Sequence, residues 1–262
     1  MVLSALSPQR RRLVVVAVCL GILLIMISVI AVVRARSGAS NGVSQSEPGP
    51  VLLVPGYGGN VSSLEPLAAA LRSAGRTAMI IAPPGDGTGD LQGQAQHVGE
   101  VAERAMEDSG ASSVDIVGYS AGGVVARLWV HDEGGDRFAR RVLTLGSPHH
   151  GTAQAALGAE LAGGCPPACQ QLVPESDLLR RLNAGDETPE GPLWVTVRSS
   201  SDQVVTPVDS AALEGAVNIR VQDVCQTSTA AHGDLPSDPV VLAALGSVLG
   251  IEPPHPPTEV RC

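Results

Sequence analysis

Apolar residues beyond residue 50 gather in six short runs, each followed by a turn or by a longer amphipathic stretch. Continuous runs of this length are typical of strands buried on both faces of a parallel sheet. The amphipathic stretches predict helices at about 62–72, 91–108, 175–183 and 238–249, with one more that begins at Ala121. The pattern therefore predicts an α/β fold with about six mostly parallel strands flanked by helices. The six runs are 51–54, 77–82, 114–118, 142–146, 193–198 and 217–221.

The segment 149–192 contains no run of this kind, and we expect an insertion above the carboxyl edge of the sheet. Its leucines leave two interpretations open: they line a binding groove beneath a lid, or they occupy ordinary helix-core positions. These leucines are Leu157, Leu161, Leu172, Leu178, Leu179 and Leu182.

A longer apolar segment lies near the N-terminus. Residues 13–33 carry no charge and follow three consecutive arginines. At about 1.5 Å per residue, such a helix spans a bilayer, and the positive flank predicts that the N-terminus stays inside. We expect a signal anchor or signal peptide at 1–36, a flexible linker at 37–50 and one α/β domain at 51–262. Whether or not the segment is cleaved, the domain is expected outside the cytoplasm, either membrane-anchored or secreted.

The charge of the predicted domain excludes some partners. Five of the 17 basic residues, all arginine, flank the first apolar run, which leaves 12 against all 26 acidic residues. Such an acidic body repels nucleic acid and anionic lipid surfaces. We therefore expect no nucleic-acid partner, and we expect a monomer.

Cysteine usage agrees with export. Cys19 lies in the apolar segment, and the other four cysteines allow three pairings. Cys165 and Cys169 bracket a Pro-Pro turn, so a local bridge is expected, and Cys225 would then pair with Cys262. A zinc site is the rival interpretation, but the cysteines lack the CxxC spacing of such sites. Disulfides are therefore favoured.

A candidate nucleophile lies where the third predicted strand meets a helix. Residues 118–122 read Gly-Tyr-Ser-Ala-Gly, the pattern of a nucleophile elbow with Ser120 at its centre. The tight turn lifts the serine hydroxyl above the sheet, and the helix that begins at Ala121 directs its amides toward a developing oxyanion. The alternative is a glycine-rich turn with an incidental serine.

A serine nucleophile needs a base and an acid that orients the base. His232 follows the last predicted strand and precedes the final helix, which is where hydrolases with the order Ser, Asp, His carry their base. Asp202 follows the strand 193–198, at the edge where ligand sites of such sheets lie. The competing carboxylates are Asp209, Asp223 and Asp234.

Two backbone amides are expected to form an oxyanion hole. One belongs to Ala121, and the other belongs to the glycine-rich loop after the first strand, where Tyr57 is the choice and Gly56 and Gly58 are its neighbours. This loop lacks the spacing of a phosphate-binding loop.

Two further histidines, His149 and His150, follow the fourth strand. They are candidates either for lining the site or for a structural role.

Several motifs in this order resemble the α/β-hydrolase superfamily, and within it the small bacterial triacylglycerol lipases and lipase class 2 proteins. The resemblance rests on the segments 54–59, 114–125, 145–152, 201–202 and 231–233. It implies a minimal α/β-hydrolase fold without the first two strands of the larger members. Pro55 stands where many of these lipases carry histidine, a change that leaves the backbone donors of the loop in place.

The resemblance implies a serine hydrolase that cleaves carboxylic esters, lipid acyl esters in particular, through an acyl-enzyme, and the N-terminal segment adds the expectation that it is exported. It implies no metal and no organic cofactor. Its partners would be an acyl-ester substrate and, through the N-terminal segment, a membrane. Two alternatives stay open: an envelope acyltransferase with the same three residues, and a non-catalytic binding module with a hydrolase fold.

Overall fold

The computed structural model describes residues 9, 21, 26, 42–161 and 164–262. The chain divides into two units, Met1–Asn41 and Gly42–Cys262. The predicted anchor at 13–33 falls almost entirely outside the described residues, so its role and the domain boundaries stay predictions. Among the residues that are described, no helix is both long enough and apolar enough to cross a membrane.

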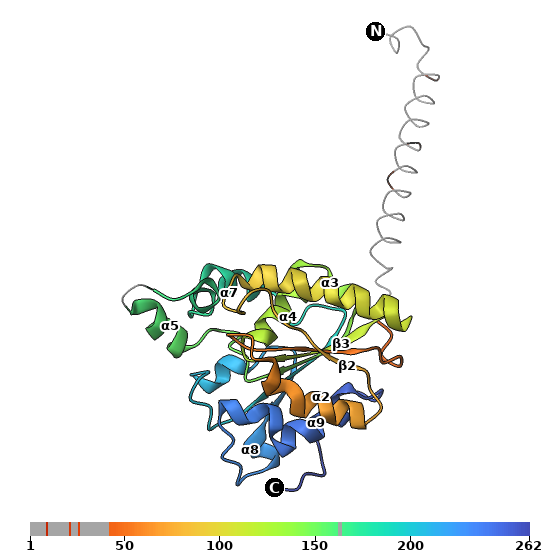
Figure 1. Ribbon diagram of the computed structural model, residues 1–262. Coiled ribbons are helices and arrows are strands. Elements are labelled where there is room, and N and C mark those ends of the chain that lie inside the picture. The colour runs from red at the N-terminus through yellow and green to blue at the C-terminus, as the bar shows by residue number, and fades with distance from the viewer. Residues whose placement is uncertain (1–8, 10–20, 22–25, 27–41, 162–163) are drawn as a thin grey trace. The chain divides into compact units, whose positions relative to one another are not determined.

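The second unit is built on a parallel sheet with the strand order β2-β1-β3-β4-β5-β6 (Figure 1). Every neighbouring pair of strands is parallel. Each of the six predicted runs forms one strand, so the predicted fold class is confirmed. The strands are β1 (Val51–Val54), β2 (Ala78–Ile80), β3 (Val114–Tyr119), β4 (Ala139–Leu145), β5 (Leu193–Arg198) and β6 (Val217–Arg220).

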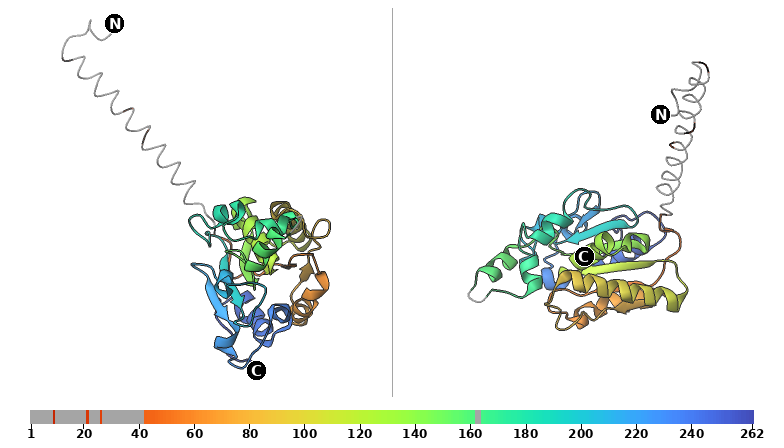
Figure 2. Two further views of the ribbon diagram at one scale, coloured as in Figure 1. Left: turned by 90° about the vertical axis from the view of Figure 1, so that its left-hand side faces the viewer. Right: turned by 90° about the horizontal axis from the view of Figure 1, so that it is seen from above.

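Helices cover both faces of this sheet (Figures 1 and 2). On one face, α3 (Leu91–Ser109) and α4 (Ala121–Asp132) pack with Leu52 and Val54 of β1. On the other face, α2 (Glu65–Ser73) and α9 (Pro239–Leu249) pack with Val51 and Leu53. Since successive residues of a strand face opposite sides, this double burial explains why β1 is apolar throughout. The shorter elements here are η2 (Val61–Leu64), η3 (Gly135–Arg137), η4 (Val208–Ala211), α8 (Val221–Val224) and η5 (His232–Ser237).

Strand β4 begins at Ala139, three residues before its predicted start. The residues that the prediction left out include two buried arginines, Arg140 and Arg141. Arg140 is fully buried and donates to Oδ2 of Asp115 at 2.6 Å and to the carbonyl of Leu249 at 2.7 Å. Arg141 is also buried and donates to the carbonyl of Val248 at the end of α9 and to that of Glu252 beyond it. Because these two charged residues interrupt the apolar pattern, the sequence predicted too short a strand. The ion pair of Arg140 with Asp115 and the contacts with carbonyl groups offset the cost of burying both arginines.

The insertion at 149–192 is helical in its described residues. It contains α5 (Ala153–Glu160), α6 (Pro167–Gln171) and α7 (Asp177–Leu182), which gather at one end of the domain (green in Figure 2). The leucines of α7 are buried in the core, whereas Leu157 and Leu161 are 61% and 62% exposed. The helix-core interpretation is therefore correct for Leu178, Leu179 and Leu182.

Both expected disulfides are present. Cys165 is bonded to Cys169, next to α6, and Cys225 is bonded to Cys262, which ties the C-terminal tail to the end of α8. The four cysteines considered as zinc ligands therefore form the two disulfides. Disulfides persist in oxidising compartments, so the pairing agrees with a protein that functions outside the cytoplasm.

Candidate active site

Ser120 occupies a strained turn between β3 and α4. Its φ is 54° and its ψ is −126°, a conformation that side chains other than glycine rarely adopt. Apart from Ser120, only Glu175 among the non-glycine residues described has a positive φ. Such strain costs about 1–3 kcal/mol and persists only where surrounding structure enforces it.

Glycines on both sides of the serine enforce this turn. A Cβ atom on Gly118 would lie 2.5 Å from the Cα of Gly123, and one on Gly122 would lie 2.2 Å from the carbonyl oxygen of Val54. Backbone therefore touches backbone where α4 crosses β3 and β1. The glycines of the motif are required by this contact.

His232 begins η5 and lies directly beside the serine. Its Nε2 is 3.0 Å from Oγ of Ser120, and its Nδ1 is 2.7 Å from Oδ2 of Asp202. An ionised carboxylate can only accept, so Nδ1 carries the proton and Nε2 is free to accept from the serine hydroxyl. The structure thus brings together the three side chains that the sequence singled out.

Asp202 is held in place by its own loop. Its Oδ1 accepts hydrogen bonds from the amides of Val204 and Val205 at 2.8 and 2.9 Å, which leaves Oδ2 directed at the histidine. Asp202 and His232 are 3% and 8% exposed, so water weakens their interaction little. The hydroxyl of Tyr119 donates to the backbone carbonyl of His232 at 3.1 Å.

The competing carboxylates bind other groups. Asp209 accepts from Arg198 at 3.1 Å, and Asp234 accepts from the amide of Ala231 at 2.8 Å. Asp223 lies in α8, and none of the three pairs with His232 in the described structure.

The expected oxyanion donors flank the serine. Ala121 is the first residue of α4, and Tyr57 follows β1 and lines the same cavity as Ser120. No described residue accepts a hydrogen bond from either amide, so both are free for a ligand. The amide of Gly58, by contrast, donates to the carbonyl of Gly87 at 3.3 Å.

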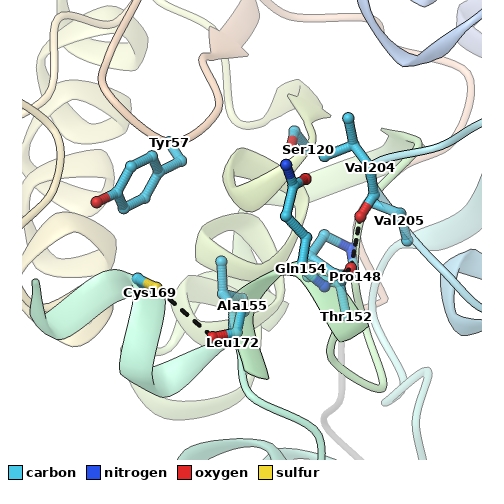
Figure 3. Close-up of a pocket in the computed structure, with 10 residues that line it drawn as sticks. All are labelled: Tyr57, Ser120, Pro148, Thr152, Gln154, Ala155, Cys169, Leu172, Val204 and Val205. Carbon is cyan, nitrogen blue, oxygen red and sulfur yellow. Dashed lines mark hydrogen bonds between the residues drawn. The ribbon is translucent and has the colours of Figure 1, made fainter. Parts of the chain in front are cut away.

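A cavity of about 280 Å³ opens beside Ser120 (Figure 3). Most of its lining is apolar and comes from the loop after β4, from α5 and α6, and from the loop after Asp202. Sequence reasoning missed most of these residues, since nothing in an apolar side chain marks it as part of a site. In Figure 3 the side chain of Gln154 extends toward Ser120. The lining residues are Tyr57, Ser120, Pro148, Thr152, Gln154, Ala155, Cys169, Leu172, Val204 and Val205.

The two histidines after β4 lie outside this cavity. His149 is fully buried, and its Nε2 lies 3.0 Å from Oγ1 of Thr144. Burial lowers the pKa of His149 well below its ordinary value, and the nearby charge of Arg127 lowers it further. His150 is partly exposed and lies 2.6 Å from Glu187. Both histidines therefore have structural positions.

Arg127 joins the elbow helix to the insertion. It is 2% exposed and donates to Oδ1 of Asn183 at 2.8 Å and to the carbonyl of Leu182 at 3.2 Å. Burial lowers its pKa to about 10. The amide of Asn183 in turn donates to the carbonyl of His149 at 2.9 Å, so α4, α7 and the segment after β4 form one network.

A parallel sheet of this order, with a serine elbow after β3 and a histidine after the last strand, defines an α/β-hydrolase. The family model for lipase (class 2) matches residues 98–242, more than half of the chain. The chain therefore belongs to the lipase (class 2) family, which confirms the suspected family and the predicted enzyme class of carboxylic ester hydrolases. The matched segment contains Ser120, Asp202 and His232.

Two solved lipases share the fold. Lipase B of Aspergillus fumigatus superposes with a TM-score of 0.72 at 22% identity, over 84% of this chain and 57% of that chain. The mature form of the Bacillus licheniformis lipase BlEst2 superposes with a TM-score of 0.64 at 17% identity, over 78% of this chain and 93% of that chain. The chain thus spans little more than half the length of the Aspergillus lipase. No curated protein sequence matches it.

The glycine contacts predict that a glycine-to-alanine substitution changes stability in opposite directions at two helical positions. Gly122→Ala should lower the free energy of unfolding by about 1–3 kcal/mol or more, because its Cβ would meet the backbone of Val54. Gly246→Ala, in α9, meets nothing within 4 Å and should raise stability by about 0.5–1 kcal/mol. Urea unfolding of both variants measures the difference. Equal stability of the two would contradict the backbone contact.

The buried His149 predicts a pH dependence of stability. The unfolded chain binds a proton at this side chain near pH 6.5, whereas the folded chain, whose pKa is lowered, does not. Unfolding then takes up a proton, so stability present above about pH 6.5 is lost as the pH falls toward the folded-state pKa, by up to about 1.4 kcal/mol per pH unit.

Denaturant unfolding between about pH 7 and 5 tests this dependence. His149→Gln should flatten the slope, and His255→Gln, at an exposed tail position, should leave it unchanged. If His149→Gln keeps the wild-type slope, another group is responsible.

Proposed function

We propose that this protein is an exported serine hydrolase that cleaves carboxylic esters, lipid acyl esters in particular. One observation supports the proposal above all others: a continuous chain of contacts runs from Oγ of Ser120 through His232 to Asp202, at 3.0 and 2.7 Å. A non-catalytic binding module would not need such a chain, nor the strained backbone that presents the serine.

The first half of the reaction forms an acyl-enzyme. Oγ of Ser120 attacks the ester carbonyl as Nε2 of His232 accepts the hydroxyl proton. The amides of Tyr57 and Ala121 donate to the oxygen that becomes negative, and the helix dipole of α4 adds to this stabilisation. His232 then gives its proton to the alcohol oxygen, the ester bond breaks, and the alcohol leaves.

The second half releases the acid. Water gives a proton to Nε2 of His232 and attacks the acyl carbon, and the same two amides hold the second oxyanion. The bond to Oγ breaks, and Ser120 regains its proton from the imidazolium. Throughout, the carboxylate of Asp202 holds the ring and stabilises its charged form.

Lipid acyl esters are supported by the family and by the cavity. The chain belongs to the lipase (class 2) family, and both solved structures described above carry the name lipase. The cavity beside Ser120 is mostly apolar, as an acyl chain requires. Export is supported by the two disulfides and by the uncharged segment that follows the N-terminal arginines. The protein is then either tethered by that segment or secreted.

Ser120 is expected to react with a serine-directed fluorophosphonate. Ser120→Ala should abolish labelling and lower kcat on a p-nitrophenyl ester by at least about 10⁴-fold, because no other group can form the acyl-enzyme. Ser73→Ala, at an exposed position at the end of α2, is the control and should label and turn over as the wild type does. Wild-type protein that resists the probe, or Ser120→Ala that labels equally, refutes the proposal.

The orienting acid is tested by two matched substitutions. Asp202→Asn should lower kcat by about 10⁴-fold, because a neutral amide cannot hold the required tautomer or stabilise the imidazolium. Asp234→Asn, two residues after the base, should change kcat less than tenfold, since Asp234 contacts the amide of Ala231 and not the ring. Steady-state kinetics at a fixed pH compare the two. A larger effect at Asp234 would reassign the acid.

A further inference from the structure

The cavity touches the nucleophile but not the base. Its lining includes Ser120 and Tyr57, whereas His232 and Asp202 do not contribute to it. During ester cleavage the base must reach the alcohol oxygen, so the alcohol lies on the side of His232. The acyl chain then extends the other way, into the cavity. This assignment rests on the proposed function.

The interior of the cavity suits an unbranched hydrocarbon. Pro148, Ala155, Leu172 and Val204 supply apolar surface, and no lining residue carries a charged side chain. The hydroxyl of Thr152 is already used, since it donates to the carbonyl of Val204. Each methylene that is buried there should raise kcat/KM about fourfold, until the space is filled.

Helix α6 forms the wall that lies away from Ser120 (Figure 3), where Cys169 and Leu172 face the cavity. The disulfide between Cys165 and Cys169 closes the turn that leads into this helix. Gly158 of α5 packs against the same bridge, because a Cβ there would lie 3.3 Å from Sγ of Cys169. Thus α5 and α6 meet at the disulfide.

The wall is also tied to the rest of the domain. The amide of Ala168 donates to the carbonyl of Thr88 at 3.1 Å, and the amide of Leu91 donates to Oε1 of Gln171 at 2.8 Å. The amide of Thr152 donates to the carbonyl of Leu172 at 3.0 Å. Helix α6 is therefore attached both to the start of α3 and to the segment after β4, and it cannot move aside without breaking these bonds.

The volume behind the serine sets the length of chain that fits. The cavity of about 280 Å³ begins at Ser120 and is bounded by α6 on the side away from the serine. We propose that α6, held by its hydrogen bonds to the domain and by the Cys165–Cys169 bridge, limits the acyl chain to short and medium lengths. The substrate class is thus esters of short- and medium-chain unbranched acids, and long-chain esters are excluded by the wall.

A series of p-nitrophenyl esters tests the limit in the full-length protein. Acyl chains of two, four, eight, twelve and sixteen carbons are compared at one detergent concentration. We expect kcat/KM to rise up to about eight carbons and to fall at least about tenfold by sixteen. A sixteen-carbon ester that is cleaved as well as the eight-carbon ester overturns the proposal.

Variants of the wall test its cause. Leu172→Ala enlarges the cavity, and the double variant Cys165→Ser/Cys169→Ser loosens the turn that leads into α6. Each should raise the ratio of kcat/KM for the sixteen-carbon ester to that for the eight-carbon ester by about fourfold or more, roughly one methylene's contribution. Because the ratio is taken within one preparation, partial loss of folded protein cancels. An unchanged ratio in both variants overturns the role of α6.

Two controls lie outside the cavity. Leu161→Ala changes an exposed leucine of the same insertion, and Cys225→Ser/Cys262→Ser removes the other disulfide. Both should keep the wild-type ratio. Fluorophosphonate labelling distinguishes failure of the length limit from failure of the proposed function. Labelling at Ser120 together with a long-chain preference overturns the length limit alone, whereas no labelling and no hydrolysis of any ester overturns the proposed function and the limit with it.

Discussion

The close approach of α4 to the sheet is the constraint on which the site depends. At Gly118 and Gly122 the backbones of β3, β1 and α4 meet with no room for a Cβ atom. The chain can turn from strand to helix in so little space only if Ser120 adopts a positive φ, which raises its hydroxyl above the edge of the sheet. The same contact places the amide of Ala121 at the helix N-terminus, where its dipole favours a negative oxygen.

Parallel strands bring distant parts of the chain to this edge. Ser120 follows β3, Asp202 follows β5, and His232 lies beyond β6, yet their side chains form one line of contacts of 3.0 and 2.7 Å. Each member is fixed by its own loop, as the amides of Val204 and Val205 show for Asp202. In the proposed mechanism, a carboxylate that the backbone orients before substrate arrives needs no rearrangement when the imidazolium forms, and such preorganisation is a main source of electrostatic catalysis.

The sequence predicted what depends on local pattern and chain order. Six apolar runs became six strands, and the carboxyl ends of parallel strands led to Asp202 and His232. It missed what depends on packing between distant segments. The early start of β4 was hidden because Arg140 is charged, although Asp115 and the end of α9 compensate for its burial. The lining residues Val204 and Val205 were missed because ordinary apolar side chains become a pocket wall only when α5 and α6 fold over them.

Helix α4 positions both Ser120 and the insertion. Helix α4 begins beside Ser120, and two turns later its Arg127 donates to Asn183 and Leu182 at the end of α7. A buried guanidinium is costly, and its removal would leave these oxygens without a donor, so the arginine fixes where the insertion can sit. The side-chain amide of Asn183 donates to the carbonyl of His149, so the segment after β4 that leads to the cavity is held by the same network. The wall of the cavity and the hydroxyl of Ser120 are therefore both positioned relative to α4, as the proposed limit on acyl length requires.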